Sequence, residues 1–204
     1  MDFKKLQKMQ LALDTDILSQ KPKMSAKERF NKTLVALSVE LAEVANTVEH
    51  FKFWKDNKGK VDEKRFSADW SYGGKQIIGY YDNDPKGNLV GLVTFEQAHH
   101  LTLVEEAADC LHFILSLANQ IEYEIDSNLI KLAKYQIHPL ETLYMALQNK
   151  TMDLETGYDK MGSYKSLLSF YTSYIIELGI TTEELEQAYY AKNEVNYQRL
   201  EEGY

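Results

Sequence analysis

The chain has 204 residues, a formal net charge of -8 and one cysteine. This length suits a single domain, and the negative charge gives no support for binding nucleic acid or an anionic membrane. One cysteine excludes an intrachain disulfide and cysteine-rich zinc sites. The N-terminus lacks the apolar segment of a signal peptide, and no stretch is long and apolar enough to span a membrane, so we expect a cytoplasmic protein.

Apolar residues at helical spacing predict that helices make up most of the chain. In chain order, the predicted helices cover Phe3–Leu18, Ser25–Trp54, 102–121, Ile125–Tyr135, Pro139–Leu154, Ser163–Leu178 and Thr182–Glu201. The last begins with the capping-box sequence Thr181–Glu184, which is a signature of a helix N-terminus. The chain is therefore expected to be an all-α helical bundle.

Residues 57–100 differ in character from the rest. Two β-type runs, Lys75–Tyr81 and Leu89–Phe95, flank a turn-rich stretch at 82–88. We interpret 57–100 as a β-hairpin inserted between two helices. The expected organisation is one domain over residues 1–204 that carries this small hairpin subdomain.

Two pairs of acids lie at helical spacing, Glu40 with Glu43 and Glu106 with Asp109. Residues three apart share one helix face, so each pair places two carboxylates side by side. If the two helices pack together, four carboxylates converge, and anions in a shared pocket need positive charge. Hard divalent cations such as Mg²⁺ prefer oxygen ligands, so the pairs indicate a metal-dependent phosphate enzyme.

The second pair belongs to a polar stripe on an otherwise apolar helix, the mark of a buried element. The stripe consists of Thr102, Glu106, Asp109, His112, Ser116 and Asn119. Such a stripe also suits core hydrogen bonds or ion pairs to another helix, and the first pair also suits a solvated surface. Both interpretations of the acids stay open at this point.

The C-terminal helix carries a third group of polar residues. Lys192, Asn196 and Arg199 are spaced i, i+4 and i+7 and share a face, which Asn193 borders. Two cations with two carboxamides suit a phosphate chain, since Arg can contact phosphate with two parallel hydrogen bonds. The alternative is a solvated basic face on a terminal helix.

Taken together, these blocks resemble the dimeric, all-α dUTPases of bacteria, phages and trypanosomatids, which are relatives of the MazG-like NTP pyrophosphatases. The resemblance is carried by ELAE at 40–43, EAAD at 106–109, FKFWK at 51–55, DCLHFILS at 109–116, the tail at 192–204 and LQKMQLALD at 6–14. It runs from end to end of the chain. It implies a homodimer in a bacterial or phage-infected cell.

The resemblance also implies roles for particular residues. Glu40, Glu43, Glu106 and Asp109 would hold two or three Mg²⁺ ions, with Glu40 or Glu43 activating a water that attacks the α-phosphorus of dUTP. Lys192, Asn193, Asn196 and Arg199 would hold the phosphate chain. Gln10 and Trp54 would address uracil, Asp14 would stand near the base, and His112 would contact the nucleoside near the sugar 3′-hydroxyl.

Three alternatives remain from the residues. The substrate could be dCTP or several dNTPs. Asp109 and His112 together resemble the carboxylate–histidine pair of a di-iron bundle, although the first acid pair ends in Glu43 and not in histidine. The insert, with Tyr72, Tyr80 and Tyr81, could bind a partner such as a repressor protein.

Overall fold

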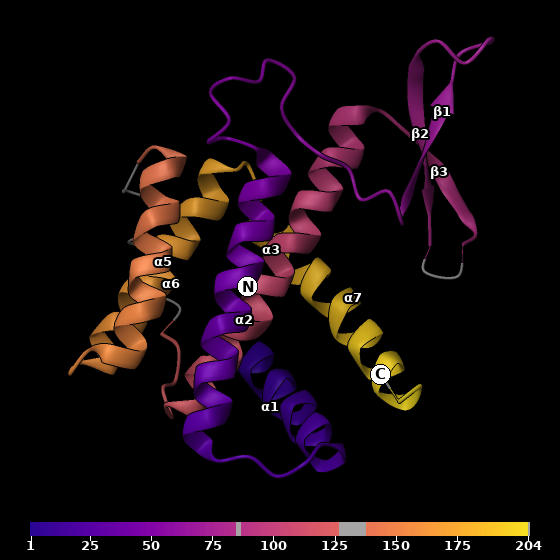
Figure 1. The fold of residues 1–204 in the computed structure, drawn as a ribbon. Helices are drawn as coiled ribbons and strands as arrows, with labels where there is room; N and C mark the ends of the chain where they lie inside the picture. Colours follow the sequence, from indigo (N-terminus) through magenta and orange to yellow (C-terminus); the bar gives the residue numbers. More distant parts are fainter. Residues whose placement is uncertain (85–86, 127–137, 204) are drawn as a thin grey trace. The chain divides into compact units, whose positions relative to one another are not determined.

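The computed structural model describes residues 1–84, 87–126 and 138–203 (Figure 1). Most of the helix expected at Ile125–Tyr135 lies outside these residues. The chain divides into two compact units, Met1–Glu43 with Glu105–Tyr204, and Val44–Val104. Each unit is described by itself below.

The described helices are α1 (Phe3–Gln20), α2 (Ala26–Val48), α3 (Phe95–Gln120), α5 (Leu140–Thr156), α6 (Lys160–Glu177) and α7 (Thr182–Glu201). The expected all-α fold with a small β insert is confirmed. Asp2 caps α1 by accepting a hydrogen bond from the Lys5 amide at 3.1 Å. The capping box at the start of α7 is present as expected, with Thr181 and Glu184 each bonding the other's backbone amide. None of the described helices is both long and apolar enough to cross a membrane.

Tyrosine side chains fix α3 and α1 to their neighbours in the first unit. From α6, the buried Tyr164 and Tyr171 hydroxyls donate to backbone carbonyls of α3, Tyr171 to Ala107 at 2.6 Å. From α7, the Tyr189 hydroxyl donates to the Leu6 carbonyl of α1 at 3.3 Å. Helices α5 and α6 lie side by side (Figure 1). Each ring fills the core while its polar tip finds a partner, which holds the helices in a fixed register.

Helix α2 ends at Val48, six residues before the predicted end at Trp54, so that prediction was wrong. The backbone turns at Glu49, whose φ of 57° is incompatible with a continuing right-handed helix. The Glu49 carboxylate is buried, pairs with the ammonium groups of Lys52 and Lys55, and accepts from the Gly59 amide at 3.2 Å. These contacts stabilise a turn where apolar periodicity alone favours helix.

The second unit contains a three-stranded antiparallel sheet and not the simple hairpin that the sequence predicts. Its strands are β1 (Phe66–Trp70), β2 (Ile77–Asn83) and β3 (Leu89–Val93), in the order β1-β2-β3. Arg65 clamps Asp82 of β2 with two hydrogen bonds of 2.7 and 2.8 Å. Helix α3 begins directly after the sheet, at Phe95 and not at 102 as expected.

Candidate functional site

Three of the four acids of the two pairs meet within the first unit. Glu40 of α2 and Glu106 and Asp109 of α3 each offer a carboxylate oxygen, and these oxygens lie within 4.8 Å of one another. All three side chains are half-buried, whereas Glu43, one turn after Glu40, is exposed. The helical spacing therefore brings three of the four predicted acids together, and Glu43 lies outside this group of three.

Mutual repulsion and burial perturb these acids. Burial, and after it the charges of Asp109 and Glu43, raise the pKa of Glu40 to about 7. Burial, and after it the charges of Glu43 and Asp109, raise the pKa of Glu106 to about 7. Burial also raises the pKa of Asp109, although the neighbouring Lys192 opposes this. Several carboxylates that resist ionisation together mark a site that gains from added positive charge.

The donor set suits a hard divalent cation. All the converging ligand atoms are carboxylate oxygens, which Mg²⁺ prefers. Among the described residues, this cluster contains no histidine and no cysteine. Carboxylates of raised pKa need a cation in order to ionise together near neutral pH. The residues present therefore fit Mg²⁺.

The raised pKa values predict that the metal-free protein loses stability as the pH rises. The ordinary glutamate pKa is 4.5, while Glu40 and Glu106 reach about 7 in the fold. Between these values the folded chain binds more protons than the unfolded chain, so stability present below pH 4.5 is lost as the pH passes 7. Because Mg²⁺ binds the ionised acids, we expect it to raise the Tm more at about pH 8 than at about pH 5.

Thermal unfolding in EDTA and in Mg²⁺ at both pH values checks this prediction. The Glu40→Gln variant is the internal comparison, since removing one ionisable acid should flatten the pH dependence of the metal-free protein. An equal Mg²⁺ shift at both pH values would contradict it.

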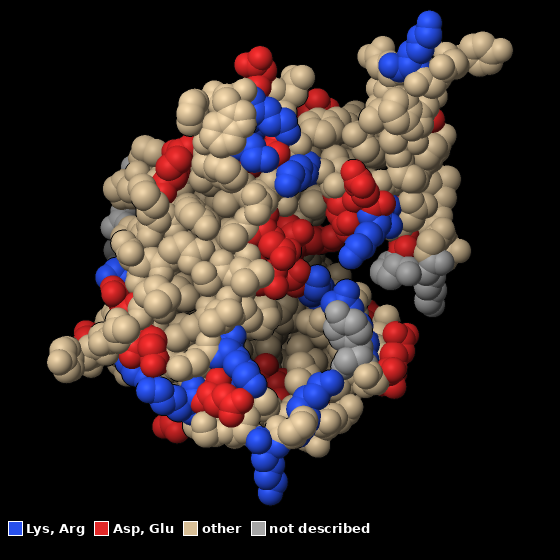
Figure 2. Space-filling model, in the orientation of Figure 1, with Lys and Arg blue, Asp and Glu red and all other residues tan. Residues whose placement is uncertain are grey.

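Helix α7 supplies positive charge to the acids. Lys192 Nζ lies 2.6 Å from a carboxylate oxygen of Asp109, and the charge of the exposed Arg199 also lowers the pKa of Asp109. Asn196 is half-buried on the same helix. On the face drawn in Figure 2, acidic and basic side chains of the described residues are interspersed. The structure thus brings Lys192 to the acid cluster and Arg199 close enough to affect it.

A buried polar network lies one turn further along α3. His112 Nδ1 is 2.7 Å from Gln10 Oε1, and the His112 ring stacks on Tyr189 of α7 with centroids 4.2 Å apart. Asp14 accepts from the Gln10 amide at 2.8 Å, from Arg29 at 2.8 Å and from Ser116 at 2.6 Å. Gln10, Asp14 and His112 are thus held together by one another.

Arg29 and Tyr189 are the members of this network that sequence reasoning missed. Arg29 lies near the start of α2, where a sequence-based interpretation predicts an ordinary solvent-exposed side chain. Tyr189 lies three residues before Lys192 on α7 and gives no chemical signal beyond aromaticity. Nothing in the sequence distinguishes Arg29 from the other lysines and arginines as the partner of Asp14.

Two buried side-chain atoms of the predicted site have no hydrogen-bond partner among the described residues, His112 Nε2 and Asn193 Nδ2. Both side chains are 5% exposed. Buried polar atoms are normally paired, so unpaired ones in a candidate site indicate places where a ligand supplies the partner.

Trp54 and the tyrosines of the insert belong to the second unit. Trp54 is 66% exposed and meets Phe53 and Phe51 edge-on, so it is not a core anchor. Tyr72 is fully exposed, and the Tyr81 hydroxyl donates to Asp69 at 3.0 Å. Contact of Trp54 with uracil and of the insert with a partner stay predictions.

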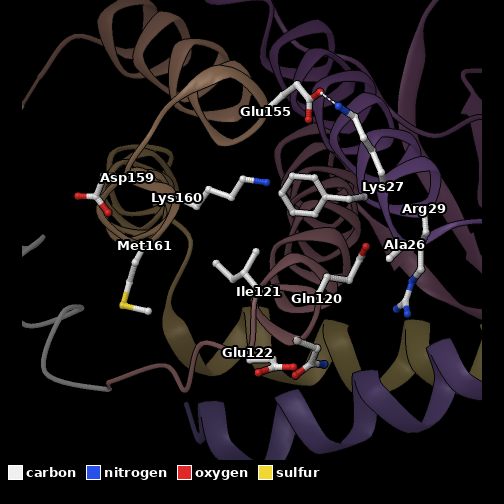
Figure 3. A pocket seen from close by; sticks show the side chains of 12 residues that line it. Ala26, Lys27, Arg29, Gln120, Ile121, Glu122, Glu155, Asp159, Lys160 and Met161 are labelled. Atoms are coloured by element: carbon white, nitrogen blue, oxygen red, sulfur yellow. Dashed lines mark ion pairs between the residues drawn. The ribbon is translucent and has the colours of Figure 1, made fainter.

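A separate cavity of about 880 Å³ lies among the start of α2, the end of α3 and the facing ends of α5 and α6 (Figure 3). Apolar groups of Phe30, Ile121 and Met161 share it with Lys27 and Lys160. Lys27 bonds Glu155 at 3.4 Å, and Lys160 sits 4.6 Å over the Phe30 ring. Its described lining contains none of the predicted site residues.

Cys110 follows Asp109 on α3 and is fully buried. Burial, and after it the nearby carboxylates, raise the pKa of its thiol well above the ordinary value. A thiol in such surroundings stays protonated and is a poor nucleophile or metal ligand. The interpretation of Cys110 as a small core residue agrees with this position.

The fold and the site define a helical protein with an acidic centre, a neighbouring lysine and a buried polar network. A sequence model of the family described as dUTPase matches residues 2–70 and 94–204. The chain therefore belongs to this family, the all-α dimeric dUTPases, and is a dUTP diphosphatase. The match leaves out residues 71–93, which hold β2 and β3. Among curated proteins none matches the chain.

Proposed function

We propose that the protein hydrolyses dUTP to dUMP and pyrophosphate with two or three Mg²⁺ ions held by Glu40, Glu43, Glu106 and Asp109. The observation that carries this proposal is the convergence of the half-buried carboxylates of α2 and α3, with pKa values near 7 for Glu40 and Glu106. Family membership supports dUTP as the substrate.

Each charged side chain has a role in this proposal. Bound Mg²⁺ supplies charge neutralisation of the triphosphate and lowers the pKa of bound water. Glu40 accepts a proton from the attacking water, and the oxygen of this water forms a bond to the α-phosphorus. The bond from the α-phosphorus to the oxygen that bridges to the β-phosphorus breaks, which releases pyrophosphate and leaves dUMP. The raised pKa of Glu40 suits a general base. Glu43 is the second candidate for this role.

The phosphate chain and the nucleoside contact different parts of the first unit. Lys192 and Arg199 bind phosphate oxygens, assisted by the carboxamides of Asn193 and Asn196. His112 and the residues around it face the nucleoside. In support of this division, Asp109 and His112 lie one turn apart on α3, so phosphate and sugar would both be within reach of one helix face.

Pyrophosphate release from dUTP, dCTP, dTTP and UTP, with Mg²⁺ and with EDTA, tests the proposal. We expect turnover of dUTP that requires the metal. Comparable turnover of dCTP or of several dNTPs would keep the site and replace the substrate by the alternative named above. Folded protein without turnover of any nucleotide would contradict the proposal.

Assembly as a homodimer is a further part of the proposal and rests on family membership. Light scattering on the purified protein measures its mass directly. If the measured mass at assay concentrations is that of one chain, the homodimer proposal is contradicted, while the proposed chemistry is unaffected.

A further inference from the structure

A line of hydrogen bonds runs from α2 through α1 to α3. Arg29 Nη2 donates to Asp14 Oδ2 at 2.8 Å, and Gln10 Nε2 donates to Asp14 Oδ1 at 2.8 Å. Gln10 Oε1 then lies 2.7 Å from His112 Nδ1. Figure 3 shows Arg29 extending from α2 at the rim of the cavity. These four residues connect an ion pair to the imidazole ring of His112.

The ion pair dictates the direction of every hydrogen bond in the line. Arg29 can only donate, so it faces a carboxylate oxygen of Asp14. The other oxygen of Asp14 also accepts, so Gln10 must turn its NH₂ group toward Asp14 and its carbonyl toward His112. The Tyr189 hydroxyl lies 3.1 Å from the same Gln10 carbonyl and shares its one hydrogen between this carbonyl and that of Leu6. His112 Nδ1 therefore carries the ring hydrogen.

This arrangement leaves Nε2 of His112 as a buried acceptor. Burial, and after it the charge of Lys192, lower the pKa of His112 to about 3, so the ring is neutral and Nε2 has a free lone pair. A hydrogen bond between the ring and the Tyr189 backbone has a smaller, opposite effect and raises this pKa. No described residue donates to this atom. A buried acceptor without a donor is costly, so a bound group is the natural source of the donor.

We propose that Arg29 and Asp14 are positioning residues that fix the Gln10 amide, so that His112 offers Nε2 as an acceptor to a hydrogen-bond donor of the bound nucleoside. The proposal deepens the proposed function and rests on it. Two groups of deoxyuridine are donors, the 3′-hydroxyl and the N3–H of uracil. Cytosine has a hydrogen-bond acceptor at N3 where uracil has a donor. A contact between His112 Nε2 and the uracil N3–H would therefore also distinguish uracil from cytosine.

The Asp14→Asn variant tests the line with almost no change of shape. Arg29 and Ser116 both donate to one oxygen of Asp14, so the new amide must place its oxygen there and its NH₂ group toward Gln10. Gln10 then turns over, donates to His112 Nδ1, and drives the ring hydrogen to Nε2. Adding Gln10→Glu restores an acceptor beside His112 Nδ1 and should restore the original tautomer.

The readout is the ¹⁵N NMR spectrum of the histidine rings, which distinguishes a protonated from an unprotonated ring nitrogen. It is recorded without metal or nucleotide, and His112 is assigned from the signals that disappear in His112→Asn. We expect Nδ1–H in the wild-type protein, Nε2–H in Asp14→Asn, and no change in Glu177→Gln, an exposed carboxylate-to-amide control on α6. Nε2–H in the wild-type protein would overturn the proposal without any variant having to fold.

Kinetics identify the donor. For dUTP we expect Asp14→Asn to lower kcat/KM by about 10- to 100-fold, because an acceptor becomes a donor in a buried site. With 2′,3′-dideoxyuridine triphosphate the loss should disappear if the donor is the 3′-hydroxyl, and with N3-methyl-dUTP if it is N3–H. An equal loss on all three substrates would overturn the nucleoside contact.

The two measurements separate this inference from the function on which it rests. A wild-type protein that hydrolyses no dUTP contradicts the proposed function, whatever the tautomer of His112. A wild-type protein that hydrolyses dUTP with His112 in the Nε2–H form contradicts the inference alone.

Discussion

Replacing Glu106 by Gln is expected to lower kcat/KM for dUTP by about 100- to 1,000-fold, the scale of losing one charged group aimed at a reacting centre. Its carboxylate oxygen lies within 4.8 Å of those of Glu40 and Asp109, so the change removes a cation ligand and one negative charge at once. The amide keeps the size of the side chain. Pyrophosphate release over a series of Mg²⁺ concentrations should show a higher metal requirement as well as slower turnover.

The fold of this variant should be unharmed in EDTA. Glu106 is an acid whose ionisation is opposed by burial and by neighbouring charges, so a neutral side chain relieves repulsion. Thermal unfolding in EDTA should therefore show a Tm equal to or above that of the wild type near neutral pH. Glu177→Gln serves as the control for an isosteric loss of charge at an exposed position. Wild-type turnover and metal requirement in Glu106→Gln would remove Glu106 from the site.

Replacing Lys192 by Met is expected to lower kcat/KM for dUTP by about 10- to 100-fold, mainly through a higher KM. Lys192 lies 2.6 Å from Asp109, and its charge lowers the pKa values of Glu40, Glu106 and Asp109. Its loss should move the acidic limb of the pH–rate profile to higher pH, because the acids then ionise less readily.

The Lys192→Arg variant separates charge from shape. It keeps the positive charge, so the pH–rate profile should stay close to that of the wild type even if the different geometry of the guanidinium reduces the rate. Met and Arg variants with the same shifted profile would show that the charge of Lys192 does not control the acids.

The acid cluster could be predicted because helix geometry translates spacing directly into direction. Glu106 and Asp109 are three residues apart on one face of a helix whose neighbouring residues are mostly apolar and buried, so this face had to meet another polar group in the core. Glu40 on α2 supplies it. The start of α7 was equally readable, since a capping box is a local interaction between Thr181 and Glu184.

Features that depend on contacts between distant residues were not readable. The end of α2 is set by Glu49 and its lysine partners, and a buried ion cluster has no apolar periodicity to reveal it. Strand β1 has the sequence FSADW, which contains no β-branched residue, and it forms because β2 lies beside it. The pairing of Asp14 with Arg29 joins two helices across a separation of 15 residues. A single sequence contains no signal for such a pair.

The fully buried position of Cys110 has a practical consequence for handling the enzyme. The chain has no second cysteine, and this one is protonated and out of reach of solvent. Thiol-directed reagents therefore have no target while α3 is packed, whereas exposed methionines such as Met145 and Met152 are open to oxidants. When α3 separates from its neighbours, the thiol becomes reactive. The rate at which Cys110 is alkylated then reports how often the helix that carries Glu106 and Asp109 opens.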